Sequence, residues 1–209
     1  DALPICYKDI SKKELFFSGN TKKQIDRLSA LLNEEQFSKI RMALKSKGLP
    51  EGFCCLFYGG PGTGKTELVQ QLAIDTERDL MQVDLSTLRD KYVGESEKRV
   101  KQVFSNYRAL LSRNGKAPIL FFNEADAIIG KRLENVQRSV DKMENSMQNI
   151  ILEEIEKLDG ILIATTNLTC NMDKAFERRF IYKIEFDKPS MEAKSAIWQS
   201  MIPDLSSED

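Results

Sequence analysis

The chain has 209 residues, 41% hydrophobic and 30% charged, which is typical of one globular α/β domain or of a domain with part of another. Its 31 Lys and Arg nearly balance 32 Asp and Glu, and a net charge of −1 disfavours a duplex-binding surface. The sequence has no histidine, which excludes His-based metal sites, Ser-His-Asp triads and Cys-His dyads. No apolar run is long enough to span a membrane, so we expect no membrane segment.

The N-terminus and the cysteines indicate the setting of the chain. The first residues lack a Met and a basic-then-apolar leader, which predicts a piece of a longer protein without a signal peptide. Cys6, Cys54, Cys55 and Cys170 have no CxxC spacing, and the adjacent pair lies in an apolar run where cysteine behaves as a small core residue. We therefore expect a reducing, cytoplasmic location.

In chain order, the apolar spacing predicts strands that alternate with helices. Residues 21–47 have helical spacing with a break near Asn33. Further helices are predicted after residue 65, from Ser96, over 140–158 with Gly160 ending it, and after Pro189. The predicted strands are 53–58, 80–83, 118–122, 161–166 and 180–186. This order predicts a doubly wound, parallel, five-stranded sheet with helices on both faces and helices preceding it.

One glycine-rich segment is chemically specific. Residues 59–66 match G-x-x-x-x-G-K-[ST] between a predicted buried strand and a predicted helix. Glycines let successive backbone N–H groups turn toward a polyphosphate, and a helix N-terminus favours the same anion. Lys65 adds a charge for the β- and γ-phosphates, and the Thr66 hydroxyl can ligate Mg²⁺. We predict a nucleoside triphosphate site here; the alternative is a glycine-rich turn that only joins strand to helix.

The predicted phosphate site consists of nine consecutive residues. They are Gly59, Gly60, Pro61, Gly62, Thr63, Gly64, Lys65, Thr66 and Glu67.

Polar residues also follow two later strands. Asn123 and Glu124 end the strand at 118–122, and Glu124 lies where an acid would orient or deprotonate the attacking water. Asn167 follows the strand 161–166, and its amide could reach the γ-phosphate or the water. Each strand end could instead cap a helix or stabilise a turn. Arg178 and Arg179 are either solvated charges or an arginine finger for a neighbouring subunit.

In this order, the features resemble the AAA family of ring-forming ATPases within the AAA+ superfamily. Residues 59–66 match its Walker A motif and 119–124 its Walker B motif. Residues 161–167 resemble the sensor-1 strand, and 175–180 resemble the arginine-finger segment. The resemblance implies binding and hydrolysis of ATP with Mg²⁺, in a self-associated ring that we expect to be hexameric.

The resemblance also implies roles for individual residues. The metal would be held by Thr66 and Asn123. The implied catalytic residues are Lys65, Glu124, Asn167, Arg178 and Arg179, of which either arginine would complete the site of the next subunit.

Two further segments narrow the class. Residues 91–97 are similar to the family's pore loop, in which Tyr92 and Val93 would grip an extended polypeptide client. The alternative is that Tyr92 packs in its own core. A pore loop implies protein remodelling or unfolding, with nucleic acid and membranes not expected as partners. Phe17-Ser18-Gly19 is similar to the family's adenine-contacting turn.

The sequence departs from the family pattern in two places. Walker B has Asn123 where Asp is usual, which removes a negative charge and predicts weaker retention of Mg²⁺, while Glu124 is intact. After a large ATP-binding domain at 1–187, only 188–209 are available for the C-terminal helical lid, so the lid is truncated and no sensor-2 arginine can be assigned.

The leading hypothesis is therefore an ATP hydrolase coupled to protein remodelling. The first alternative is an ATP-binding assembly scaffold with little hydrolysis, because Asn123 replaces an acid. The second is a small-molecule P-loop kinase, which would require an acceptor pocket and lid arginines.

Overall fold

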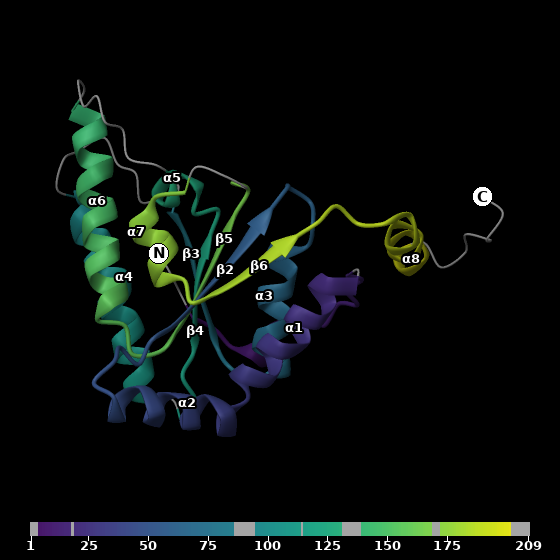
Figure 1. Ribbon diagram of the computed structural model, residues 1–209, viewed down its shortest axis with the longest axis horizontal. Coiled ribbons are helices and arrows are strands. Elements are labelled where there is room, and N and C mark those ends of the chain that lie inside the picture. The colour runs from purple at the N-terminus through teal and green to yellow at the C-terminus, as the bar shows by residue number, and fades with distance from the viewer. Residues whose placement is uncertain are drawn as a thin grey trace.

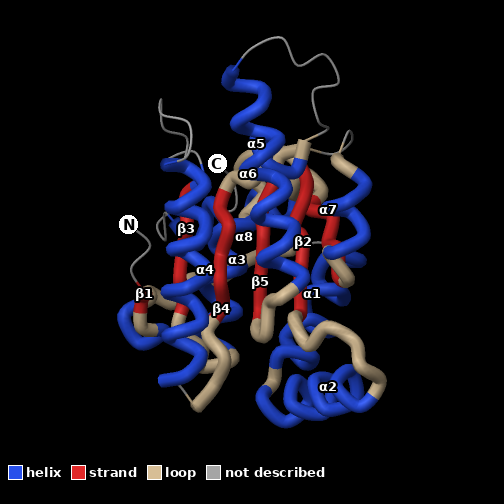
Figure 2. Tube along the Cα trace, turned by 90° about the vertical axis from the view of Figure 1, so that its left-hand side faces the viewer, coloured by secondary structure: helices blue, strands red, loops and turns tan. Residues whose placement is uncertain are grey.

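The computed structural model describes residues 4–17, 19–85, 95–113, 115–130, 139–168 and 172–201. A six-stranded sheet runs through it in the order β1-β3-β4-β5-β2-β6, with several of the strands side by side in Figure 2. The strands are β1 Pro4–Ile5, β2 Phe53–Gly59, β3 Leu80–Asp84, β4 Ile119–Asn123, β5 Ile161–Thr166 and β6 Tyr182–Phe186. Strands β3, β4, β5, β2 and β6 pair in parallel, which confirms the predicted parallel five-stranded sheet.

The sixth strand was not predicted. β1 pairs antiparallel with the edge strand β3, with Pro4 opposite Met81 and Ile5 opposite Leu80. A strand of two residues is too short to have a recognisable alternation of apolar and polar side chains, so only the pairing itself reveals it.

Helices cover both faces of the sheet, as a doubly wound fold requires. Figure 1 shows α4 and α6 on one side of the strands and α1 and α3 on the other, with α8 set apart beyond the end of β6. The helices are α1 Gly19–Leu32, α2 Glu34–Ser46, α3 Lys65–Asp75, α4 Glu95–Arg113, α5 Asp126–Ile129, α6 Ser139–Glu156, α7 Lys174–Arg179 and α8 Met191–Met201.

Two hydrophobic clusters lie on the two faces because successive strand residues point in opposite directions. Leu56 packs with the residues of α4 and α6, whereas Phe57 packs with those of α1 and α3. Cys54 and Cys55 divide between the clusters in the same way, and both are buried and free. Burial raises the pKa of Cys54 to about 12, so its thiol stays protonated and behaves as a core residue.

Local details at the helix ends agree with the sequence in one place and differ in two. The predicted break at Asn33 is the N-cap of α2, where the Asn33 side chain accepts a hydrogen bond from the backbone N–H of Glu35 at 3.1 Å. Ser96 lies inside the first turn of α4, which begins one residue earlier, so it is not the cap that we expected. The last strand begins at Tyr182 because α7 extends to Arg179.

Gly160 does not end a helix in the left-handed conformation, contrary to expectation. α6 ends at Glu156, and Gly160 is needed instead because a Cβ there would lie 2.2 Å from the hydroxyl of Tyr107. That hydroxyl donates to the carbonyl of Pro118 at 2.7 Å and accepts from the backbone N–H of Ile161 at 2.9 Å. Tyr107 therefore links α4 to the starts of two strands, and the glycine makes room for it.

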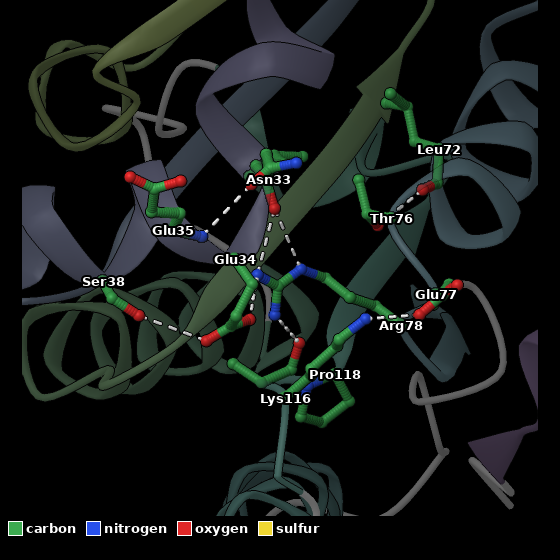
Figure 3. Close-up of polar contacts among 12 residues, drawn as sticks. Asn33, Glu34, Glu35, Ser38, Leu72, Thr76, Glu77, Arg78, Lys116 and Pro118 are labelled. Atoms are coloured by element: carbon green, nitrogen blue, oxygen red, sulfur yellow. Dashed lines mark hydrogen bonds and ion pairs between the residues drawn. The ribbon is translucent and has the colours of Figure 1, made fainter.

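A buried arginine connects α1 and α2 to the sheet. It lies at the amino ends of the parallel strands, opposite the carboxyl ends that carry the predicted site. The Arg78 side chain is 0% exposed. It donates to the carbonyls of Leu32 at 3.0 Å and Ala117 at 2.8 Å, and to the carboxylate of Glu34 at 2.7 Å (Figure 3). Its guanidinium carbon lies 5.0 Å from the centroid of the Phe37 ring. The sequence did not indicate this contact, since Arg78 is far along the chain from both Leu32 and Ala117.

We expect Arg78→Met to lower the free energy of unfolding by about 3–5 kcal/mol, because it leaves two buried carbonyls without donors and Glu34 without its partner. Denaturant unfolding measures the loss. Lys157→Met is the control, since Lys157 pairs with Glu153 on the surface and its removal should change stability little. Equal stabilities of the two variants would contradict the structural role of Arg78.

Candidate functional site

The predicted phosphate loop and two strand ends enclose one cavity of about 240 Å³. It lies at the carboxyl ends of the parallel strands, where ligands bind in open α/β sheets. β5 lies between β4 and β2, so the loop that follows β2 faces the ends of both other strands. The cavity is lined by Pro61, Gly62, Thr63, Gly64, Lys65, Thr66, Glu67, Asn123, Glu124, Thr165, Thr166 and Asn167.

The loop backbone has the geometry of an anion site. Gly62 and Gly64 have φ values of +70° and +88°, which residues with a Cβ rarely adopt. Gly64 is also the N-cap of α3, so the helix N-terminus opens into the same cavity. The Thr63 hydroxyl donates to the carbonyl of Gly60 at 2.9 Å and fixes the turn. Residues 59–66 could therefore receive an anion, as the predicted phosphate site requires.

Lys65 is the buried cation of the site. Its ammonium donates to the carbonyls of Gly59 at 2.8 Å and Gly60 at 2.7 Å, and to Oδ1 of Asn167 at 3.1 Å. Burial lowers the pKa of Lys65, and the nearby carboxylate of Asp126 opposes this shift. The ammonium is thus held by neutral oxygens, and a phosphate would supply the negative charge that these oxygens lack.

An amide takes the place of the usual carboxylate beside Thr66. Oδ1 of Asn123 accepts hydrogen bonds from the hydroxyls of Thr66 at 3.0 Å and Thr165 at 3.2 Å. No group of three or more acidic or Cys side chains that could hold a metal occurs in the described part of the chain. Mg²⁺ binds through one or two protein oxygens together with phosphates and water, so the hydroxyl of Thr66 and the amide oxygen of Asn123 could hold it.

Glu124 has a strained backbone. Its φ is +52°, in the left-handed region that an acidic side chain seldom occupies. Its N–H donates to the hydroxyl of Thr165 at 3.2 Å, and its exposed side chain lines the cavity. Such strain persists where the surrounding structure imposes it, and it is common in active sites.

One acidic residue of the site was missed in the sequence. Asp126, the first residue of α5, accepts hydrogen bonds from the backbone N–H of Asn167 at 2.7 Å, from its Nδ2 at 3.3 Å and from the hydroxyl of Thr166. The spacing of Asp126 two residues after Glu124 was the available signal, but nothing in the sequence placed it beside the end of β5.

The two arginines of α7 lie outside the cavity and differ from each other. Arg179 forms an ion pair with Glu156 and donates to the carbonyl of Ala175 at 3.2 Å within its own chain. Arg178 is exposed, and within the described residues it has no ion pair or hydrogen bond. The two arginines, which the sequence could not distinguish, therefore differ in their contacts within the chain.

A larger cavity of about 590 Å³ lies beside α3, away from the strand ends. Phe17 and Gly19, which belong to the predicted adenine-contacting turn, line it together with Leu68 of α3 and Ala193 of α8. Ser18 lies outside the described residues. We regard the smaller cavity as the chemical site, because it holds the lysine, the acid and the two amides.

Two other expectations concern the pore loop and membrane-spanning helices. The predicted pore-loop residues Tyr92 and Val93 lie outside the described residues. Of the helices that the structure describes, none combines the length and apolarity that crossing a bilayer requires.

Comparison with known proteins gives a consistent match. The family described as "ATPase family associated with various cellular activities (AAA)" matches residues 55–188. A 26S proteasome regulatory subunit 7 homolog from Schizosaccharomyces pombe is 33% identical over 188 residues, covering 86% of this chain and 40% of the relative. Cell division protein C from Sulfolobus acidocaldarius is 31% identical over 157 residues, covering 72% of this chain and 40% of that protein. The chain thus spans about two fifths of the length of these relatives.

The backbone strain at Glu124 predicts that the usual order of stability of alanine and glycine variants is reversed at this position. Alanine normally stabilises a protein more than glycine, but at a left-handed position we expect Glu124→Gly to be more stable than Glu124→Ala by about 1 kcal/mol. Thermal or denaturant unfolding of the two variants measures the order. The control is Glu153, exposed in α6, where Ala should be the more stable substitution. The same order at both positions would contradict the strain.

Proposed function

The chain belongs to the AAA family of ATPases, and from this premise we propose that it binds ATP with Mg²⁺ and hydrolyses the γ-phosphate as one subunit of a ring. The observation that carries the proposal is the single cavity in which Lys65, Thr66 and Glu124 meet the amides of Asn123 and Asn167. Each of these groups has a use in phosphoryl transfer to water, which depends on positioning and charge stabilisation.

The phosphate tail would enter the loop and draw the Lys65 ammonium from the carbonyls that hold it. Its negative oxygens are stronger acceptors than the neutral oxygens of Gly59, Gly60 and Asn167. Thr66 and Asn123 would hold Mg²⁺, which neutralises the phosphate charge that develops in the transition state. The adenosine end could extend toward the larger cavity along α3, on the side of Phe17.

Glu124 would act on the attacking water. It is the one carboxylate among the residues that line the cavity at the strand ends, with Glu67 at the loop side paired to Lys13 at 2.8 Å. A carboxylate held at this place can orient the water and accept its proton. Asn167, on the neighbouring strand end, would contact either the γ-phosphate or the water.

Ring assembly and a polypeptide client are the finer parts of the proposal. The relatives named as 26S proteasome regulatory subunits support a polypeptide client, engaged by Tyr92 and Val93, and a ring that we expect to be a hexamer. Arg178 is the better candidate for the arginine finger, because Arg179 is already paired with Glu156. We keep 1–187 as the large domain and 188–209 as the start of a lid, and a reducing cytoplasmic compartment as the expected location.

The second candidate function is an ATP-binding scaffold that assembles but hydrolyses little. Asn123 favours it, because the oxygen that Thr66 faces belongs to a neutral amide and attracts Mg²⁺ less than a carboxylate does. The strained, cavity-facing Glu124 favours hydrolysis, and we therefore rank hydrolysis first. The family match favours either candidate over a small-molecule kinase.

Phosphate release decides between the two candidates. We expect Glu124→Gln to lower the ATP turnover number by about 100-fold or more while ATP binding persists, because the variant loses the base but keeps the phosphate loop. If the scaffold reading is correct, the wild-type chain and Glu124→Gln release phosphate equally slowly, and Asn123→Asp raises the rate. Binding of a non-hydrolysable ATP analogue, measured by calorimetry, is the control for both variants.

Mixed assemblies test the arginine finger. We expect Arg178→Ala to lower turnover by about 10³-fold, because each site would lack the guanidinium from its neighbour. Mixing it with Glu124→Gln should restore part of the activity, since an intact site then meets an intact finger. Arg179→Ala is the matched control: because Arg179 is paired with Glu156 in its own chain, this variant should keep its turnover without mixing. A mixture no more active than its two components would remove Arg178 from this role.

A further inference from the structure

Asp126 makes a set of contacts that the proposed reaction does not yet use. Its carboxylate accepts three hydrogen bonds from the end of β5, two of them from Asn167: one from the backbone N–H at 2.7 Å and one from Nδ2 at 3.3 Å. The third comes from the hydroxyl of Thr166. Asp126 itself does not line the cavity, whereas Asn167 does. Asp126 can therefore act on the reaction through Asn167, besides the effect of its charge on Lys65.

The two neighbours of the Asn167 amide fix its orientation by their chemistry. A carboxylate can only accept hydrogen bonds, so the NH₂ group of Asn167 must face Asp126. An ammonium can only donate, so the oxygen of the same amide must face Lys65, which lies 3.1 Å away. Both constraints select the same rotamer, with the NH₂ turned out of the site and the oxygen turned toward it.

This orientation limits what Asn167 can do with a bound nucleotide. Phosphate oxygens at neutral pH are acceptors, and an amide oxygen has nothing to donate to them. When a phosphate draws Lys65 away, Oδ1 of Asn167 is left facing the cavity as an acceptor, and the O–H of a water is the donor that it can take. Glu124, which lines the same cavity, needs that water to be held in place.

We propose that Asp126 is a positioning residue that keeps the oxygen of Asn167 toward the reaction space, so that Asn167 orients the attacking water rather than binding the γ-phosphate. The proposal rests on the proposed ATP hydrolysis. Without the carboxylate, the amide of Asn167 is free to rotate by half a turn and to donate its NH₂ group to the phosphate. ATP would then bind as well or better, but the water would lose one of its acceptors.

The test separates turnover from binding in the 209-residue chain. Asp126→Asn keeps an oxygen for the Thr166 hydroxyl and the Asn167 N–H but no longer dictates the amide orientation. We expect the turnover number to fall about 10- to 100-fold, as is typical when a supporting hydrogen-bond partner is removed, with no weakening of affinity for a non-hydrolysable ATP analogue. Weaker binding of the analogue, or turnover within about twofold of the wild type, would overturn the proposal.

A double-mutant cycle tests whether Asp126 acts through Asn167. In an Asn167→Ala background, Asp126→Asn should lower turnover no further, because the group that it positions is gone. An equal loss in both backgrounds would show that Asp126 acts by another route and would overturn the proposal. Asp173→Asn is the matched control, since Asp173 also accepts a backbone N–H, that of Ala175 at 2.7 Å, but Ala175, unlike Asn167, does not line the cavity. It should leave turnover unchanged.

A third measurement does not need hydrolysis and so separates this proposal from the proposed function. In ¹⁵N-labelled chain, the side-chain NH₂ resonances of Asn167 can be assigned by their loss in Asn167→Ala. We expect one proton to be shifted downfield by the carboxylate and to move upfield in Asp126→Asn. Unchanged resonances would overturn the positioning role, whereas the expected shift in a chain without turnover would refute only the proposed ATPase activity.

Discussion

The site depends on how the Lys65 ammonium is held. A buried cation without a carboxylate in direct contact is electrostatically unfavourable, and burial accordingly lowers the pKa of Lys65. Its hydrogen bonds run to carbonyls of the loop and to Asn167, so one side chain joins the end of β2 to the end of β5. In the proposed function, a polyphosphate would supply the missing negative charge. The loop is thus already shaped by the same cation that its ligand would neutralise.

The strand order converts this local arrangement into a reaction centre. Because β5 lies between β2 and β4, the loop after β2 meets polar residues from two other strands at one edge of the sheet. Thr165 shows the connection most directly, since its hydroxyl contacts both the Asn123 side chain and the Glu124 backbone. At the opposite ends of the strands, the buried Arg78 joins the start of α2 to the segment that precedes β4. This anchoring does not involve the strand ends that carry the site.

Charge is distributed around the site in an unusual way. The residue beside Thr66 is a neutral amide. An acid outside the cavity, Asp126, accepts hydrogen bonds from Asn167 and opposes the lowering of the Lys65 pKa by burial. The side chain that would face Mg²⁺ thus carries no negative charge, whereas the carboxylate of Asp126 lies beside the amide of Asn167. A neutral amide at Asn123 would hold Mg²⁺ less strongly than a carboxylate. We rank hydrolysis above a scaffold role because Glu124 is present and lines the cavity.

The sequence alone determined the parallel sheet, the phosphate loop and the polar strand ends, because strand alternation, glycine spacing and the Lys65-Thr66 pair are local patterns. It could not determine what depends on contacts between distant segments. The short strand β1, the close approach of Tyr107 to Gly160, the burial of Arg78 and the pairing of Arg179 with Glu156 appear only when the chain is packed. The orientation of the Asn167 amide also depends on distant segments. Its partners Asp126 and Lys65 follow β4 and β2, and the order of the strands places them on opposite sides of Asn167.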